Sequence, residues 1–240
     1  MSLKKLWNMI NEAGHIPKIT IDLMGKRAAV DNDPFYLRVV EDFYKDAKRP
    51  HPKLLVIGFL EYGVAVNPFP ESHEEWLKSI EGSARRNIKK AIRKGYRFEK
   101  INYNDYLADI QEIHRSTSVR QGKMPDELLH GELKPVENPP SKTNVHDYPY
   151  FGVLKDDKLL AYAGCLVAGE MLLNATFFGH DKYKSDGLVP YLFSGIAEYR
   201  YKHYPHTVYY VYDKYYGASE NLKRFKRKLG FMPYRVIWKL

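Results

Sequence analysis

The sequence predicts an α/β (α+β) fold in which a mixed, mostly antiparallel sheet is flanked by helices. Residues 150–178 contain three runs of strand-forming residues separated by turn residues, which is typical of an antiparallel meander. From residue 188 the apolar residues recur at every third or fourth position, which indicates a helix. A strand at 208–212, a helix at 219–229 and a strand at 232–238 follow. This order of elements places sheet and helices in one fold.

The first half of the chain predicts shorter elements. We expect helices at 1–12 and 35–45, the second capped by Asp33 and opened by Pro34. Residues 53–66 favour two short strands or one bulged strand. A basic amphipathic helix at 83–94 ends at Gly95, a strand covers 96–101, and a helix covers the region around 107–113. Residues 131–149 contain four prolines, so we expect a loop there and a candidate flap over a site.

Composition excludes several classes of protein. At 240 residues and 44% hydrophobic, the chain can bury a core, and its formal charge of +9 favours partners that carry phosphate. The most hydrophobic run, residues 54–60, is stopped by Glu61, so we expect a cytoplasmic protein without a membrane span. The single Cys165 excludes an intrachain disulfide, and the nine histidines show no metal-ligand spacing. No dinucleotide-binding or P-loop motif is present.

The element order after residue 150 resembles the acyl-CoA N-acyltransferase (GNAT) fold. In that fold a loop with a basic residue, Gly, and Gly or Ala holds the donor pyrophosphate on amides at a helix start. Residues 184–189, Lys-Ser-Asp-Gly-Leu-Val, correspond to this loop: Lys184 and Gly187 match, and Val189 replaces the small residue. The resemblance implies an acyl-CoA donor, no metal, and a separation of the strand ending near 178 from the strand at 208–212. The donor-binding residues it implies are Phe178, Gly179, Lys182, Lys184, Ser185, Asp186, Gly187, Leu188, Val189 and Asn221.

A second set of residues is similar to the Fem-type transferases within this superfamily. Residues 222–230, Leu-Lys-Arg-Phe-Lys-Arg-Lys-Leu-Gly, resemble their Arg-Phe-Lys signature, and Lys226 stands where ordinary GNAT acetyltransferases often have a general-acid Tyr. Residues 83–95 and 114–122 are similar to the start of the Fem-type domain. Fem-type enzymes use aminoacyl-tRNA on peptidoglycan precursors and usually have two GNAT-like halves. Residues 1–81 are too short for a full half, so we expect a partial or accessory segment there and the transferase domain at 82–240.

Acyl transfer to an amine passes through a tetrahedral oxyanion and needs a route for a proton. By the resemblance, Lys226 supplies positive charge and Phe225 packs inward; on the residues alone, Lys226 is better explained as a solvated charge in a basic run. His180, Asp181 and Asp213 follow strands and are candidate bases, or else turn and surface residues. We rank Asp213 first, because Fem-like relatives often carry Asp there.

Three functions remain open on the sequence. The first is acyl transfer from acyl-CoA to an amine or hydroxyl, in which the acceptor is a small molecule or a cell-envelope or polysaccharide precursor. The second is Fem-like transfer from aminoacyl-tRNA. The third is a non-catalytic GNAT-like module that binds RNA through the basic residues of 85–97 and the tyrosines of 199–216.

Overall fold

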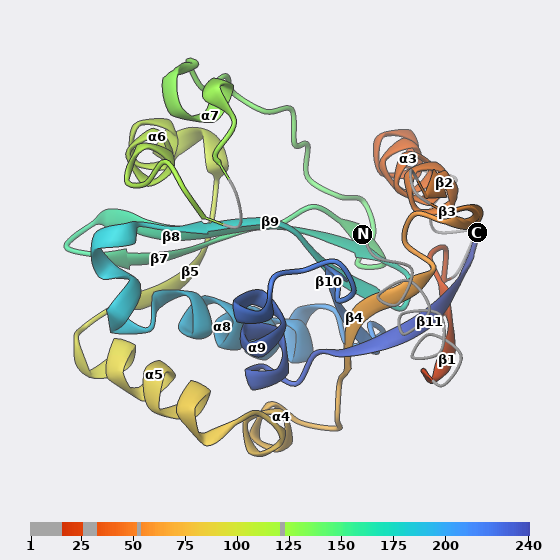
Figure 1. The fold of residues 1–240 in the computed structure, drawn as a ribbon. Coiled ribbons are helices and arrows are strands. Elements are labelled where there is room, and N and C mark those ends of the chain that lie inside the picture. Colours follow the sequence, from red (N-terminus) through yellow and green to blue (C-terminus); the bar gives the residue numbers. More distant parts are fainter. Residues whose placement is uncertain (1–15, 26–32, 52–53, 121–122) are drawn as a thin grey trace.

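The fold is built on one large mixed sheet. The computed structural model describes residues 16–25, 33–51, 54–120 and 123–240, so the helix expected at 1–12 lies outside the described residues. In these ranges nine strands pair in the order β1-β11-β4-β10-β9-β8-β7-β5, with β6 added beside β8 (Figure 1). The strands are β1 (Lys18–Asp22), β4 (Tyr62–Pro68), β5 (Arg97–Ile101), β6 (His146–Asp147), β7 (Tyr150–Lys155), β8 (Lys158–Ala168), β9 (Met171–Gly179), β10 (Tyr209–Lys214) and β11 (Met232–Lys239).

The pairing confirms a mixed, mostly antiparallel sheet. β7, β8 and β9 form the predicted antiparallel meander, β5 pairs antiparallel with β7, and β4 pairs antiparallel with both β10 and β11. Parallel pairing joins β1 to β11 and β10 to β9. The turn between β7 and β8 places Asp156 and Asp157 at φ of 50° and 59°, a conformation that aspartate tolerates better than most residues.

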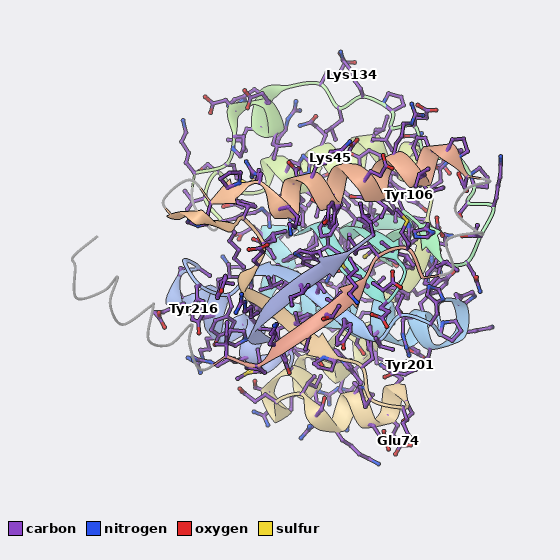
Figure 2. The ribbon with its side chains drawn as sticks, turned by 90° about the vertical axis from the view of Figure 1, so that its right-hand side faces the viewer. Lys45, Glu74, Tyr106, Lys134, Tyr201 and Tyr216 are labelled. Carbon is purple, nitrogen blue, oxygen red and sulfur yellow. The ribbon has the colours of Figure 1, made fainter. Side chains whose placement is uncertain are left out.

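Helices cover both faces of the sheet. One face carries α4 (His73–Ser79), α5 (Gly82–Arg93), α8 (Leu188–His203) and α9 (Glu220–Lys228), and the other carries α3 (Pro34–Lys48), α6 (Leu107–Arg115) and α7 (Asp126–His130) (Figure 1). Figure 2 shows the same layers from the side, with Glu74 of α4 at one extreme and Lys45 of α3 and Lys134 on the opposite side. Short 3-10 helices lie at η1 (Tyr103–Tyr106) and η2 (Asp181–Asp186). None of the helices in the described ranges has the length and hydropathy needed to cross a membrane.

The first third of the chain contributes to the same sheet. Residues 53–66 fall into two strands: β3 (Leu54–Gly58) pairs with β2 (Pro50–His51) in a separate ribbon, whereas β4 lies between β10 and β11 in the main sheet. β1 and β4 therefore share a sheet with strands that follow residue 82. The boundary expected at residue 81 stays a prediction.

The proline-rich stretch 131–149 is a long connection that contains only the short strand β6. Hydrogen bonds hold it at both sides: the Val136 amide donates to Asn104 Oδ1 (2.9 Å), and the Tyr36 hydroxyl donates to the Pro139 carbonyl (2.6 Å). Asp33, expected to cap the helix at 35–45, makes no capping hydrogen bond and instead accepts from the Lys142 amide (2.9 Å). Asp33 thus occupies the N-cap position with Pro34 in the first turn, as predicted, but its side chain does not cap, because a distant backbone amide reaches the carboxylate.

Candidate functional site

The two parallel strands β9 and β10 separate within the sheet. They pair only from Met171 opposite Tyr209 to Leu173 opposite Val211, although β9 continues to Gly179. Ala175, in the unpaired part of this interior strand, is exposed. The predicted separation of these strands is therefore confirmed.

A pocket of about 340 Å³ lies beside this opening, on the face covered by α5, α8 and α9. Its volume falls at the small end of the range for small-molecule sites, and much of its lining is apolar, as is common for such sites. The pocket is lined by Ala84, Asn87, Phe177, Lys184, Gly187, Val189, Pro190, Tyr212, Leu222, Phe225, Lys228 and Leu229.

The start of α8 forms one wall of the pocket. Gly187 adopts φ of 86°, and a Cβ there would lie 2.3 Å from the Asn87 carbonyl oxygen, so both backbone conformation and space require glycine. The first amides of the helix, those of Leu188 and Val189, have no acceptor within α8. Pro190 brings no amide hydrogen. Val189 lines the pocket, so the helix start presents its amide and the positive end of the helix dipole there.

The loop before Gly187 is fastened to α5. Asp186 accepts from Lys94 Nζ (2.6 Å) and from the Tyr96 hydroxyl (2.8 Å), and Lys94 holds the pKa of this carboxyl below its usual value. The Ser185 carbonyl accepts from Lys90 Nζ (2.7 Å). Of the predicted donor-binding residues, Lys184, Gly187 and Val189 line the pocket. Ser185 and Asp186 instead hold the loop in place.

The remaining predicted donor-binding residues lie elsewhere. Phe178 packs on the opposite face of the sheet from Phe177, against the cluster around α6. Lys182 and Asn221 are exposed, and neither they nor Gly179 and Leu188 line the pocket. Leu188 is buried in the core beneath α8, so only its backbone can serve a ligand.

Lys226 is fully buried, with no exposed surface. Its Nζ donates to the carbonyl oxygens of Tyr212 (3.0 Å) and Lys214, and lies 4.1 Å from the centre of the Tyr212 ring. Burial lowers the pKa of Lys226 to about 8. The alternative that Lys226 is a solvated surface charge is wrong, because it lies on the same face of α9 as the apolar Leu222 and Leu229.

Asp213 sits between the two carbonyls that Lys226 holds. Its φ is 45°, which is uncommon for a residue other than glycine and costs about 1–3 kcal/mol. The register of β10 against β4 shifts between Val211 and Lys214, so Asp213 lies in a bulge at the point where β10 leaves β9. Its side chain is exposed and pairs with none of the described residues. Such strain at the mouth of an opening in the sheet is typical of functional residues.

His180 and Asp181 lie at the end of β9, toward α6. His180 Nε2 is 3.4 Å from Glu112 Oε1, and Asp181 accepts from Lys184 Nζ (3.0 Å). Neither residue lines the pocket, whereas Phe225 does and packs edge-to-face on Phe193 (5.8 Å between ring centres). The structure thus brings Phe225 and Lys184 together at the pocket. Asp213 and Lys226 do not line it but flank its wall residues Tyr212 and Phe225 in the chain, whereas the two β9-end candidates lie toward α6.

Comparison with known proteins finds similarity in structure but not in sequence. No family model and no curated protein matches the sequence. Among solved structures, the chain is similar to FemX, at 10% identity over 72% of this chain and 59% of that one, with a TM-score of 0.55. The chain has a GNAT-like fold similar to that of FemX.

Two further solved structures are more distant. A tandem GNAT protein from the clavulanic acid biosynthesis pathway matches at 15% identity over 58% of this chain and 43% of that one, with a TM-score of 0.41. The C-terminal domain of a putative lysylphosphatidylglycerol synthetase from Agrobacterium fabrum matches at 13% identity over 71% and 51%, with a TM-score of 0.41. The chain spans 59% of the length of FemX. Because the two are only 10% identical, the likeness concerns the fold alone.

Sequence reasoning missed much of the pocket wall. Asn87 comes from the basic helix α5, whose contact with the loop at Gly187 no local pattern predicts. Phe177 and Tyr212 face the pocket from the two separating strands, and Leu222 from α9. The alternation of β9 was a usable signal: if Phe178 faces one side of the sheet, Phe177 must face the other.

A second pocket of about 470 Å³ lies near η2. Lys94, Lys158 and Asp186 line it, but their charges are already paired: Lys94 with Asp186 (2.6 Å) and Lys158 with Glu112 (2.5 Å). Lys155 and Asp156 also line this pocket and carry opposite charges, so its lining has no excess charge that would attract an ionic ligand. The pocket at the opening between β9 and β10 is therefore the candidate site of this GNAT fold.

Proposed function

We propose that the protein is an acyltransferase that moves an acyl group from acyl-CoA to an amine or hydroxyl. The observation that carries this proposal is the apolar pocket that joins the start of α8 to the opening between β9 and β10. An acyl-CoA needs both ends of it: amides and positive charge for the pyrophosphate, and a narrow apolar passage for the arm that ends in the thioester. The expected location remains the cytoplasm.

The polar end of the pocket suits an anion. The amide of Val189, with that of Leu188 beside it, would donate hydrogen bonds to the pyrophosphate oxygens, and Lys184 and Lys228 line the same pocket. Lys228 forms no ion pair with a described residue, and the exposed Lys184 pairs with the half-buried Asp181, which a phosphate can displace. These features support a compact diphosphate rather than an extended polyanion at this position.

The chemistry follows from the residues at the opening. The acceptor nitrogen or oxygen attacks the thioester carbonyl, a C–N or C–O bond forms, and the C–S bond breaks. We assign the nucleophile's proton to the Asp213 carboxylate, and the departing thiolate of CoA takes up a proton in turn. Lys226 holds the carbonyls on both sides of Asp213, so it fixes the bulge, and its charge favours the developing oxyanion.

The test fills the pocket and measures donor binding. Leu222→Trp places a large side chain in the lining and should abolish the calorimetric heat of CoA binding, while Ile92→Trp, on the exposed side of α5, should bind like the wild type. Gly187→Pro is a poor test, because proline cannot adopt the φ of 86° found there. If the wild type binds neither CoA nor acetyl-CoA, the proposal is wrong.

A second candidate, transfer from aminoacyl-tRNA to a cell-envelope precursor, is favoured by one observation. Arg86, Lys89 and Arg93 of α5, and Arg224 and Arg227 of α9, are exposed on the two helices that border the pocket. Arg85 does not belong with them, since its Nη1 donates to the Ile80 carbonyl (2.6 Å).

Salt dependence separates the two donors. If tRNA is the donor, binding should weaken steeply between two salt concentrations and should depend on Arg86, Lys89 and Arg93 together, with no heat from CoA. A non-catalytic RNA-binding module would give the same salt dependence without any turnover.

A further inference from the structure

Neighbouring residues of strand β9 point to opposite faces of the sheet. Phe177 of β9 lines the donor pocket, and the next residue, Phe178, faces α6 on the other side of the sheet. There the Phe178 ring contacts His114 (4.6 Å between ring centres), and the Arg120 guanidinium lies 5.1 Å from its centre. Figure 1 shows α6 above the sheet and α8 below it at this position.

The Arg120 guanidinium is incompletely paired. Its Nη2 donates to the Ile113 carbonyl (3.0 Å), but its Nε is buried without a hydrogen-bond partner in the described chain. No described carboxylate forms an ion pair with it. Burial lowers the pKa of Arg120, and attraction by Asp181 offsets only part of this effect. A partly buried cation without a counter-ion is destabilising unless something outside the fold compensates it.

Arg200, which is buried, shows the hydrogen bonding expected of an arginine with a purely structural role. Arg200 donates through Nε to Thr207 Oγ1 (3.0 Å) and through Nη2 to the Pro205 carbonyl (3.0 Å). Arg200 therefore needs no ligand, because the protein itself supplies acceptors for the nitrogens that point inward. Arg120, in contrast, is held in place by one carbonyl and an aromatic ring.

His114 adds a second unpaired polar atom to the same place. It is only 2% exposed; its Nε2 lies 2.7 Å from the Tyr162 hydroxyl, and its Nδ1 has no partner among the described residues. Burial lowers the pKa of His114 to about 4, so the ring is neutral near pH 7. The neighbouring Asp181 is already bound to Lys184 and is tied to α6 by its amide, which donates to Ser116 Oγ (3.0 Å).

We propose that Arg120, supported by His114, binds an anionic group of the acceptor, either a carboxylate or a phosphate. This inference rests on the proposed function and names its acceptor class: an amine or hydroxyl compound that also carries a negative charge. The guanidinium offers paired donors to a planar carboxylate or to phosphate oxygens, and Phe178 fixes its plane. The acceptor then approaches from the α6 face while the donor occupies the α8 face, and the two meet at the opening between β9 and β10.

The test compares charged probes with neutral partners that differ only at the anion. Alanylalanine is paired with its C-terminal amide, and glucosamine 6-phosphate with glucosamine, and binding to the wild-type protein is measured by calorimetry. We expect one charged probe to bind more tightly than its neutral partner, and which pair shows this distinguishes carboxylate from phosphate. Arg120→Met should weaken that probe by about tenfold to a hundredfold, while Arg38→Met, at an exposed arginine of α3, should not.

The melting temperature distinguishes a ligand-binding arginine from a structural one. Arg120→Met should leave Tm unchanged or raise it, because methionine keeps the packing on Phe178 and removes an unpaired charge, whereas Arg200→Met should lower Tm. If neither anion outcompetes its neutral partner, or if Arg120→Met lowers Tm as Arg200→Met does and binding is unchanged, the inference is overturned. CoA binding to the wild type is measured separately, so failure of the donor proposal would be seen independently of this result.

Discussion

Replacing Lys226 with methionine tests the most unusual group in the site. Methionine has a similar length and fills the buried space, but it donates no hydrogen bond to the carbonyls of Tyr212 and Lys214. A buried acceptor left without its donor costs about 1–3 kcal/mol, so losing both should lower the free energy of unfolding by about 2–6 kcal/mol at pH 7. The bulge that carries Asp213 should then relax, and turnover should fall about a hundredfold.

The pH dependence gives this prediction a distinctive sign. The pKa of Lys226 is lowered in the folded state, from 10.5 to about 8, so between these pH values the unfolded chain binds more protons than the folded one. The free energy of unfolding of the wild type should therefore rise with pH in this window, by at most about 1.4 kcal/mol per pH unit, relative to Lys226→Met.

Urea unfolding from pH 7 to pH 9.5 measures both effects, with Lys89→Met, at an exposed lysine of α5, as the control. The reasoning is refuted if Lys226→Met matches Lys89→Met in stability and the difference from the wild type does not change with pH. Lys226→Arg separates charge from fit, because guanidinium keeps the charge in a larger, planar shape and should restore stability only in part.

Two further substitutions test the backbone of the site. Asp213→Gly should raise the free energy of unfolding by about 1 kcal/mol, because glycine tolerates φ of 45°, and should still lower turnover; a stable variant with full activity would remove Asp213 from the chemistry. Gly187→Ala should lower Tm and CoA affinity together, since a Cβ would lie 2.3 Å from the Asn87 carbonyl oxygen; unchanged melting would show that α5 moves aside easily.

The parts of the fold that sequence predicted are those fixed locally. The meander was readable because its turns use residues with positive φ, at Asp156-Asp157 and Gly169. The place of β4 between β10 and β11 was not, since it depends on pairing with strands more than 140 residues away. The hydrogen bond from Lys142 to Asp33 spans 109 residues and overrides a local capping signal in the same way.

The candidate site was predicted in part for the same reason. A run of basic residues around Lys226 predicts a solvated side chain. The helical spacing, however, places Lys226 on the same face as Leu222 and Leu229, which predicts burial. Lys226 is in fact fully buried, so the spacing was the better guide. Asn87 and Arg120 belong to segments far from the residues they serve, so their roles emerge only after the chain is folded.

The separation of β9 and β10 has a consequence for hydrogen exchange. Beyond Leu173, β9 keeps its partner β8 on one side, so alternate amides stay in the ladder, while those that point toward β10 have no strand to accept them. These amides lie in the middle of the sheet, where exchange is normally slowest, yet they should exchange at rates closer to those of a sheet edge. Two neighbouring residues of one interior strand should thus differ in protection by orders of magnitude, and a ligand seated in the opening should slow the faster one selectively.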